Sequence, residues 1–432
     1  MYPVLKKGVE LHLRPDFGTV ISGNLDKEVL VNKIGEEILE LCDGNHSIED
    51  ITNIMASRYE ENYEDVKQLV LNFLNESEKR GHIKFFEEKG THSISLSGSM
   101  EFYVPYLAMI ELTTKCNLRC HHCYVAAGEE KPANELSFDK MKEIINKLSE
   151  AGTKEIQFTG GEPLLYPWFF ELLEYSAHKI PSISVSTNGW LVNEKIANKM
   201  AKNVARVNIS LDGMEETHDY IRGVKGSFKK AVNAIEILSK ENVPVAVSFI
   251  VTPFNIEEIE NVIKISKSRG AKFFQAGAVL PAGRGNLSWV ITKEQDDYVK
   301  GKLDVLSKKY SDDGFHVANW SPKPHYEIPS FLKACGAGYR ACAISPNGDV
   351  RPCLPISYTF GNITKDSIEN IFSSSVVRYL STLKPPSKEI CGECEYLYMC
   401  KGCPAVGIAV SEIIEKKCNW NESLWKKVKE QH

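Results

Sequence analysis

The sequence predicts an α/β fold, in which an incomplete barrel of parallel strand–helix units lies between a winged-helix-like module and a cysteine-rich region. Strand and helix patterns alternate between residues 105 and 280, as is typical of a parallel sheet with helices outside it. The first 95 residues instead carry short strand patterns followed by three helical ones. Eleven of the twelve cysteines lie after residue 100. These observations predict three domains, residues 1–95, 105–320 and 321–432.

The first domain combines short strands with amphipathic helices. Strands are expected at Glu10–Arg14, Gly18–Ser22 and Glu28–Val31, and helices at Ile34–Cys42, Ile48–Tyr59 and Tyr63–Arg80. Ser47, three residues before Asp50, is typical of a helix N-cap. The last helical pattern mixes acidic residues with its lysines, so it lacks the basic face of a DNA-recognition helix, and no nucleic-acid partner is expected. The Ser- and Gly-rich stretch Gly90–Met100 is expected to be a linker.

The second domain contains the alternating pattern. Six strands are expected at Ala108–Leu112, Glu155–Thr159, Ile183–Thr187, Arg206–Leu211, Val245–Val251 and Phe273–Gly277. Ser137 is expected to cap the first helix between them, and Gly152 to end it. Six such units make a partial (β/α)6 TIM barrel. Polar motifs follow the carboxyl ends of these strands, where α/β barrels build active sites.

Composition excludes several classes of protein. A hydrophobic content of 43% and a charged content of 25% are average for globular chains, so disorder is not expected. The 52 basic and 57 acidic side chains give a net charge of −5, which argues against wrapping nucleic acid or lying on an anionic membrane. No apolar run approaches the ~18 residues of a membrane helix. Because Met1–Glu10 also lacks a signal-peptide core, a cytoplasmic location is expected.

In the reducing cytoplasm, cysteines are more often metal ligands or catalytic thiols than disulfides. Cys42 lies on an apolar helical face and is expected to be buried. A trio, Cys116, Cys120 and Cys123, follows the first barrel strand in the run CNLRCHHCY. A structural zinc site needs four protein ligands, whereas three thiolates leave one iron of a cubane cluster open. The alternative is a zinc site that His121 or His122 completes.

The next strand runs into a double glycine in EIQFTGGEP, which would let a ligand approach the backbone closely. After the C-x3-C-x2-C trio, this segment resembles the radical S-adenosylmethionine (SAM) enzymes. The resemblance implies that Cys116, Cys120 and Cys123 hold a [4Fe–4S] cluster whose fourth iron is chelated by the amino and carboxylate groups of SAM.

The same resemblance implies further SAM contacts. The GGEP segment, which faces the amino group of SAM in that family, is matched by Gly160, Gly161, Glu162 and Pro163 after Thr159. Positions that commonly meet the ribose or the carboxylate are matched by Ser186, Asn188, Ser210, Asp212 and Arg222. Tyr124 matches the aromatic position near the adenine. For each of these polar residues the alternative is an ordinary loop or cap hydrogen bond.

The remaining cysteines form an octet in the third domain. It begins with Cys335, Cys342 and Cys353 around a hairpin turn at Pro346–Asp349, and continues with Cys391, Cys394, Cys400, Cys403 and Cys418. This pattern resembles the SPASM domain, which carries auxiliary [4Fe–4S] clusters in radical SAM enzymes that modify peptides. The resemblance implies one cluster on Cys335, Cys342, Cys353 and Cys403, and another on Cys391, Cys394, Cys400 and Cys418. The alternative is a pair of zinc ribbons.

The octet departs from the SPASM pattern at one point. The family usually leaves three residues between the last two cysteines of the run, whereas only Lys401 and Gly402 separate Cys400 from Cys403. With both resemblances, the expected cofactors are SAM and three [4Fe–4S] clusters.

The first domain resembles the RiPP recognition element (PqqD-like) of ribosomal-peptide biosynthesis. That resemblance implies a precursor-peptide partner, whose leader adds a strand to the sheet edge. An electron donor such as flavodoxin or ferredoxin is also implied, and no membrane partner is expected.

The family resemblance implies a SAM-derived radical that abstracts hydrogen from a peptide carbon, and oxidative cross-linking as the outcome. A thioether from cysteine sulfur to a backbone or side-chain carbon is favoured. Carbon–carbon cross-linking, or oxidation of a protein residue as in sulfatase-maturing enzymes, is the alternative. A zinc-containing winged-helix regulator is an alternative from another class. No general base is assigned, and the sequence gives neither the peptide nor the bond formed.

Overall fold

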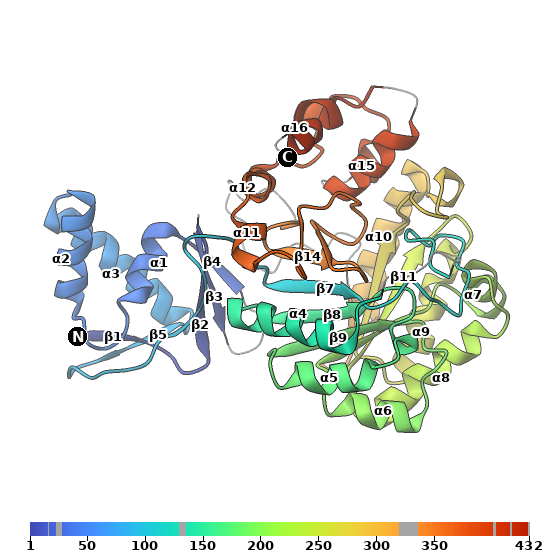
Figure 1. Cartoon of the computed structure of the whole chain (residues 1–432), viewed down its shortest axis with the longest axis horizontal. Helices are drawn as coiled ribbons and strands as arrows, with labels where there is room; N and C mark the ends of the chain where they lie inside the picture. The colour runs from blue at the N-terminus through green and yellow to red at the C-terminus, as the bar shows by residue number, and fades with distance from the viewer. Residues whose placement is uncertain are drawn as a thin grey trace. The chain divides into compact units, whose positions relative to one another are not determined.

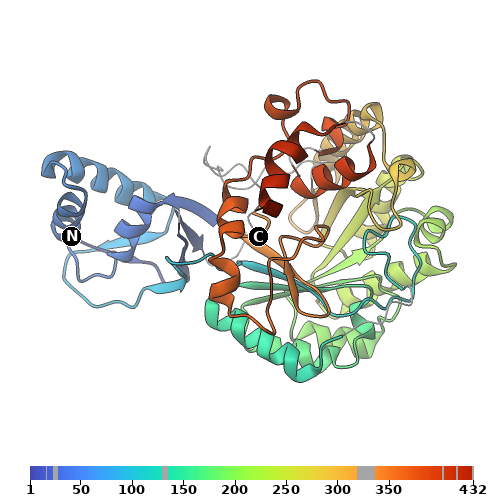
Figure 2. The same cartoon turned by 45° about the horizontal axis from the view of Figure 1, so that its top comes forward.

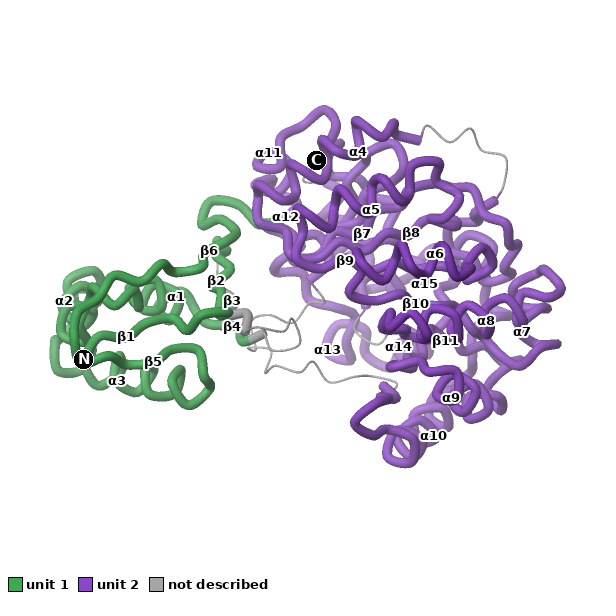
Figure 3. The backbone as a smooth tube through the Cα atoms, turned by 90° about the horizontal axis from the view of Figure 1, so that it is seen from below, with its two compact units in different colours: residues 1–104, 323–332 green, residues 105–322, 333–432 purple. Residues whose placement is uncertain are grey.

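The computed structural model describes residues 1–15, 17–22, 28–128, 135–318, 336–400, 403–414 and 417–430. They form two compact units, residues 1–104 and residues 105–430, which Figure 3 colours separately. Cys335, Lys401, Gly402 and the expected boundary between residues 320 and 321 lie outside the described residues. No helix in the described part of the chain is long and apolar enough to cross a membrane.

The first unit packs three helices against a small sheet. Its strands are β1 (Tyr2–Leu5), β2 (Val9–Leu13), β3 (Phe17–Ser22), β4 (Glu28–Asn32), β5 (Ile83–Phe86) and β6 (Ser95–Gly98), and its helices are α1 (Lys33–Glu40), α2 (Ile48–Tyr59) and α3 (Tyr63–Lys79). Four strands form one sheet in the order β4-β3-β2-β6, and β1 pairs with β5. Apolar residues of the strands and all three helices share one core, in which Cys42 is fully buried as predicted.

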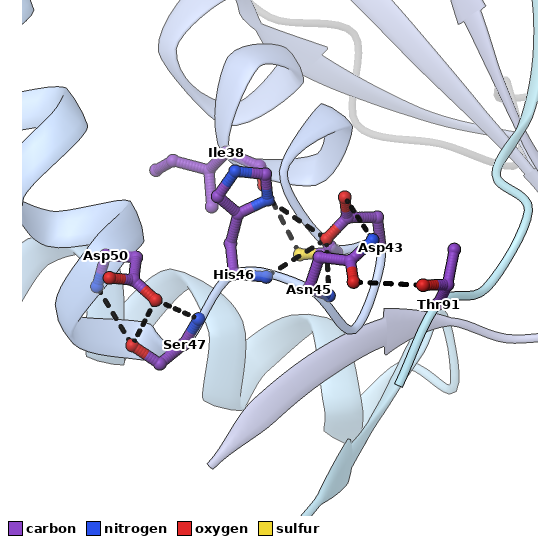
Figure 4. Close-up of polar contacts among 8 residues, drawn as sticks. Ile38, Asp43, Asn45, His46, Ser47, Asp50 and Thr91 are labelled. Atoms are coloured by element: carbon purple, nitrogen blue, oxygen red, sulfur yellow. Dashed lines mark hydrogen bonds and ion pairs between the residues drawn. The ribbon is translucent and has the colours of Figure 1, made fainter. Parts of the chain in front are cut away.

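Local hydrogen bonds explain where these helices begin. The Ser47 hydroxyl accepts the N–H of Asp50, and the Asp50 carboxylate accepts the N–H of Ser47, so the predicted cap of α2 is confirmed. Figure 4 shows the preceding turn, where the Asp43 carboxylate accepts the backbone N–H groups of Asn45 and His46 at 2.8 and 3.2 Å. Such caps satisfy N–H groups that a helix leaves unpaired and contribute about 1 kcal/mol each.

Two features of this unit were not predicted. The strands β1 and β5 pair the two ends of the module, although each has only four residues. The expected linker contains β6, which pairs in parallel with β2 through Glu10↔Ser95 and Leu13↔Gly98. Because β6 has the sequence SLSG, its strand pairing depends on the neighbouring edge and not on its own propensity.

The second unit is built on one ten-stranded sheet, in the order β13-β12-β11-β10-β9-β8-β7-β14-β15-β16. Its barrel strands are β7 (Leu107–Glu111), β8 (Glu155–Thr159), β9 (Ser182–Thr187), β10 (Arg206–Ser210), β11 (Val245–Val251), β12 (Phe273–Ala278) and β13 (His316–Val317). The helices between them are α4 (Phe138–Ala151), α5 (Phe169–Ala177), α6 (Glu194–Ala201), α7 (Glu215–Arg222), α8 (Ser227–Lys240), α9 (Ile259–Ser268) and α10 (Lys293–Tyr310).

All pairs from β7 to β13 are parallel, which confirms the partial barrel and adds β13 as a short seventh strand. Figures 1 and 2 show the helices along one side of the strands. Phe158 of β8 is fully buried on that side and contacts Phe169 of α5. Ser137 caps α4 as predicted, and Gly152 ends it with φ of 101°, a conformation that favours glycine.

The cysteine-rich region continues the barrel sheet. Its elements are β14 (Ala341–Ile344), β15 (Asp349–Arg351), β16 (Gly361–Asn362), α11 (Ile368–Phe372), α12 (Ser375–Thr382), α13 (Lys388–Cys391), α14 (Leu397–Cys400), α15 (Pro404–Ile413) and α16 (Lys426–Glu430). The hairpin predicted around Pro346 is present, because β14 and β15 are antiparallel neighbours. β14 also pairs in parallel with β7, and Lys147 of α4 donates to the carbonyl oxygens of Ile363 and Asp366.

Candidate functional site

A cavity of about 420 Å³ lies at the carboxyl ends of the barrel strands. The loop after β7 contributes all three cysteines of the trio, Cys116, Cys120 and Cys123. Residues that match the SAM motifs come from the following strands and from α7, and those that line the same cavity are Tyr124, Gly160, Gly161, Ser186, Asn188, Ser210 and Arg222. The fold therefore brings together residues that are more than 100 positions apart in the sequence, as the parallel topology predicts.

Two arginines brace the cysteine loop. The Arg284 guanidinium donates to the carbonyl oxygens of Cys120 and Ala127 at 2.8 and 2.9 Å. Arg119 donates to the carbonyl oxygen of Cys116 at 2.7 Å, and its own backbone N–H donates to Arg222 of α7. These bonds hold the backbone of the loop, and within it the Cys116 and Cys123 sulfurs also accept the N–H groups of Leu118 and Ala127.

The double glycine packs against this loop. The N–H groups of Gly161 and Glu162 donate to the carbonyl oxygens of Thr113 and Lys115 at 2.7 and 2.8 Å. A Cβ on Gly161 would lie 2.1 Å from the Lys115 oxygen, and Gly160 has a φ of 129°. The sequence suggested that these glycines admit a ligand, but the structure shows that close packing with the cysteine loop already requires them.

Glu162 supports the cavity from behind. It is fully buried, does not line the cavity, and accepts hydrogen bonds from the Thr187 hydroxyl and the Asn188 N–H at 2.7 and 2.9 Å. Burial raises the pKa of Glu162 to about 7, although these hydrogen bonds oppose the rise. The Asn188 amide in turn donates to Asn117 of the cysteine loop at 2.8 Å. Pro163 begins a short 3₁₀ turn and is likewise outside the cavity lining.

Asp212 also lies behind the cavity wall, where it fixes Arg222. Their ion pair is 2.7 Å long, and Arg222 reaches the Cys120 sulfur at 3.7 Å. Burial alone would raise the pKa of Asp212, but the Arg222 guanidinium, helped by a hydrogen bond from the Ile250 N–H, lowers it, so the carboxylate stays charged. A guanidinium held in this way places positive charge beside the cysteine trio.

The trio fits an iron–sulfur cluster by its chemistry. Burial raises the pKa of Cys116 to about 11 and that of Cys120 above its ordinary value, so each thiol keeps its proton until a metal ion displaces it. Each cysteine of a cubane binds a different iron, so the three sulfurs need not converge on one point. Among the described residues, no three His, Cys, Asp or Glu side chains are grouped tightly enough for a single metal ion.

The two histidines of the cysteine loop, His121 and His122, contact an aromatic ring and a carboxylate. The His121 ring stacks on Trp289 at 5.3 Å, and His122 lies 3.5 Å from Asp212. Burial lowers the pKa of His122 to about 4, so its ring is neutral at physiological pH. The described part of the chain thus offers no set of three cysteines and one histidine for zinc.

Sequence reasoning missed several residues of the cavity. His122 was considered only as a zinc ligand, although an imidazole between two cysteines of the loop was a signal that it shares their site. Arg284 follows β12 and carries no motif. Asn208 and Ser248 lie within strands, where only the alternation of inward and outward residues could have indicated them.

A second chamber of about 370 Å³ adjoins the first and shares Tyr124, Val125, Ala127, Gly160 and Gly161 with it. Its other walls are the ends of β7 and the β14–β15 hairpin. Glu111 of β7 and Arg351 of β15 form an ion pair there, in which the carboxylate is almost fully buried. Burial raises the pKa of Glu111, and Arg351 counteracts that rise. The pair joins the hairpin to the barrel.

The C-terminal cysteines occupy short elements. Cys342 lies buried in β14, Cys391 and Cys400 end α13 and α14, and Cys394 is exposed. Burial raises the pKa of Cys400 to about 12, and the nearby thiols Cys418, Cys391, Cys394 and Cys403 raise it further. Cys400 and three of these four neighbours, Cys391, Cys394 and Cys418, are the second ligand set that the SPASM resemblance implies. Cys335 of the first set is not described, so that set stays a prediction.

Three family models match the chain in the order of its parts. The model of coenzyme PQQ synthesis protein D matches residues 24–83, that of the radical SAM superfamily residues 110–265, and that of the SPASM iron–sulfur cluster-binding domain residues 335–395.

Two curated relatives match this chain over different shares of its length. The chain is 31% identical to the antilisterial bacteriocin subtilosin biosynthesis protein AlbA of Bacillus subtilis, over 98% of this chain and 97% of that protein. It is also 31% identical to an AdoMet-dependent heme synthase of Methanosarcina barkeri, over 71% of this chain and 93% of that protein. The fold resembles Streptococcus suis SuiB, solved with S-adenosylmethionine (TM-score 0.66, 16% identity, 96% and 98% covered) and with its precursor peptide SuiA (0.64, 16%, 94% and 96%). The chain therefore belongs to the radical SAM superfamily, as a peptide-modifying enzyme of the radical SAM/SPASM type with a PqqD-like N-terminal domain.

Proposed function

We propose that this enzyme oxidatively cross-links a ribosomally synthesised precursor peptide, with a thioether from cysteine sulfur to a backbone or side-chain carbon as the favoured bond. The observation that carries the proposal is the pair of adjoining cavities. The first contains the cysteine trio and the residues of the SAM motifs, and the second extends from it toward the cysteine-rich region. SAM and a segment of peptide have room side by side.

The second chamber suits a peptide segment. Hydroxyl and amide groups line it, from Thr113, Ser345, Asn347 and Ser357 among others. Such groups donate to and accept from main-chain amides. When bound, the cluster and SAM supply a radical that removes hydrogen from an unactivated carbon. The protein's own part is to hold that carbon still and to exclude water.

The N-terminal unit is proposed to bind the leader of the peptide. Within the described residues, β6 covers the β2 edge of its sheet, while β4 pairs only with β3. An extended leader would therefore add to β4, where main-chain hydrogen bonds supply affinity and side-chain pockets supply selectivity. The domain boundaries at residues 95, 105 and 320 are part of this proposal.

Three [4Fe–4S] clusters are proposed, one on the trio and two in the cysteine-rich region. Cys391, Cys394, Cys400 and Cys418 would hold one auxiliary cluster, and Cys335, Cys342, Cys353 and Cys403 the other. An external donor such as flavodoxin or ferredoxin would reduce the enzyme in the cytoplasm.

Two other functions are weaker. The heme synthase relative matches only 71% of this chain, whereas the subtilosin biosynthesis protein matches 98% and so includes the N-terminal unit. Carbon–carbon cross-linking uses the same site and differs only in the atoms joined.

The test is the intact mass of a short peptide encoded beside this gene, after anaerobic co-expression, before and after alkylation with iodoacetamide. Loss of two hydrogens per bond together with blocked alkylation is the expected result. The same loss with free cysteines would establish carbon–carbon bonds instead. An unchanged mass, with iron present and SAM cleaved, would refute cross-linking of that peptide.

A further inference from the structure

A belt of uncharged polar side chains crosses the inside of the barrel. Five successive strands, β8 to β12, contribute one residue each: Gln157, Ser186, Asn208, Ser248 and Gln275. Strand register places Asn208 opposite Ser186 and Ser248 opposite Gln275. Gln157 is in register with Ser184, and Ser248 with Ser210, so Gln157 lies one pleat repeat below Ser186, and Ser248 one above Asn208.

Asn208 lies deeper in the barrel than Ser210, the SAM-motif residue on the same strand. Side chains alternate along a strand, and the outward Phe158 of β8 contacts α5, so its neighbour Gln157 faces the barrel interior. Asn208 precedes Ser210 by two residues on the same face of β10. Two residues of strand correspond to about 7 Å, so Asn208 lies about that far below the rim of the cavity.

Most polar groups of the belt satisfy one another. The amide groups of Gln157 and Asn208 donate to the Ser186 hydroxyl at 2.8 and 3.3 Å, and Gln275 donates to Ser248 at 2.9 Å. The exception is the Asn208 carbonyl oxygen, which has no hydrogen-bond partner although Asn208 is only 5% exposed. A buried acceptor without a donor costs about 1–3 kcal/mol. Because Asn208 lines the cavity, a ligand can supply that donor.

The surroundings define what kind of donor fits. No Asp or Glu lines the cavity among the described residues, and the walls next to the belt include Ile250, Val279 and Leu280. The two cavity arginines already bind protein groups, Arg222 at Asp212 and Arg284 at backbone carbonyls. A charged ligand group would find no free counter-charge at this depth, so a neutral donor fits best. A peptide main chain presents a neutral N–H at every residue except proline, and the hydroxyl and amino groups of SAM are the competing neutral donors that the test must separate from it.

We propose that Asn208 accepts a main-chain N–H of the peptide segment under modification and thereby sets how deeply that segment enters the barrel. This inference rests on the proposed function. It adds to it the residue that contacts the peptide and the kind of peptide segment that fits. That segment is extended and uncharged, with small or apolar side chains beside the reacting carbon.

The test compares Asn208→Leu with Asn198→Leu, which makes the same change on the exposed face of α6. SAM affinity, and SAM cleavage with dithionite in the absence of peptide, are measured in both variants, so that a change in SAM binding is separated from a change in peptide modification. With peptide, Asn208→Leu should lower the yield of modified peptide per 5′-deoxyadenosine by about tenfold, the effect of one lost hydrogen bond and its misplacement. Asn198→Leu should not change that yield.

Parallel loss of SAM affinity in Asn208→Leu would overturn the proposal and assign Asn208 to SAM, and an unchanged yield would overturn it as well. If Asn208→Leu does not fold, Asn208→Ala provides a milder test, because it removes the same carbonyl acceptor without adding a larger apolar side chain and should lower the same yield. Failure of the wild type to modify any peptide would instead refute the proposed function.

Discussion

The two cysteine regions of this enzyme are built in different ways. The trio lies on a loop that Arg119, Arg284 and the double glycine hold through backbone hydrogen bonds. Among the C-terminal cysteines, Cys391 and Cys400 lie on helices of only four residues, α13 and α14, and Cys394 between them is exposed. Hydrogen bonds and packing organise the first region without metal. The apolar cluster around Cys400 is small, with Met399 and Val410 as its other buried members, so we expect the second region to depend on what its thiolates bind.

The largest expected effect separates the trio from an ordinary buried cysteine. Cys120→Ala should reduce SAM cleavage to the uncatalysed background, because it removes a proposed cluster ligand. Cys42→Ala, in the core of the N-terminal unit, should leave cleavage unchanged. The measurement is 5′-deoxyadenosine formation with dithionite. Full activity of Cys120→Ala would show that the trio does not hold the cluster.

Removal of iron should affect the two regions unequally. Anaerobic chelation is expected to make residues 384–420 the first sites of limited proteolysis, while the barrel resists, because closed metal sites supply folding free energy. Mass spectrometry of the fragments over time is the measurement. First cuts within β7 to β12 would show that the barrel, and not the C-terminal cysteine region, depends more on bound iron.

Asp212→Asn tests the support behind the cavity. This change leaves the buried Arg222 without its ion pair. Changes to residues that support a binding site typically cost about 10–100-fold in affinity or activity. We therefore expect SAM affinity to fall by about that factor. Asp312→Asn, at an exposed ion pair, is the matched control and should bind SAM normally. Equal SAM affinity of both variants, measured by equilibrium dialysis, would count against a role for Arg222.

The smallest effect concerns Glu162 and pH. Its pKa is about 7 in the fold and about 4.5 in the unfolded chain, so between these values the folded state binds the extra proton and stability falls as pH rises. Glu162→Gln lacks this dependence. Its stability relative to wild type should rise from pH 4.5 to 7, by at most about 3 kcal/mol, and stay level above pH 7. Thermal unfolding of both proteins across this range is the measurement, and a flat difference would contradict the buried position of Glu162.

Local patterns predicted much of this molecule. The strand at Glu155–Thr159, the cap at Ser47 and the hairpin at Pro346 follow from short-range chemistry, and all are confirmed. The pairing of β14 with β7 was not predictable in this way, because it joins segments more than 200 residues apart. β6 was missed for the same reason, since its partner strand and not its own sequence makes it a strand.

In the functional site, too, local sequence predicted some features and missed those that depend on how distant segments pack. Spacing predicted the cysteine trio, and seven of the ten SAM-motif residues do line its cavity. The sequence could not predict whether a residue lines the cavity or lies behind its lining. Glu162 and Asp212 were expected to contact SAM, but both lie behind the residues that line the cavity. Asn208 carries no motif, and only the register of β10 against β9 reveals it.

The most direct measurement of the central claim uses a precursor peptide deuterated at its carbon-bound positions. The enzyme, reduced and supplied with unlabelled SAM, should transfer deuterium from the peptide to 5′-deoxyadenosine in step with formation of the cross-link. Unlabelled 5′-deoxyadenosine beside an unmodified peptide, with the clusters intact, would contradict the assignment of this chain as a peptide cross-linking enzyme.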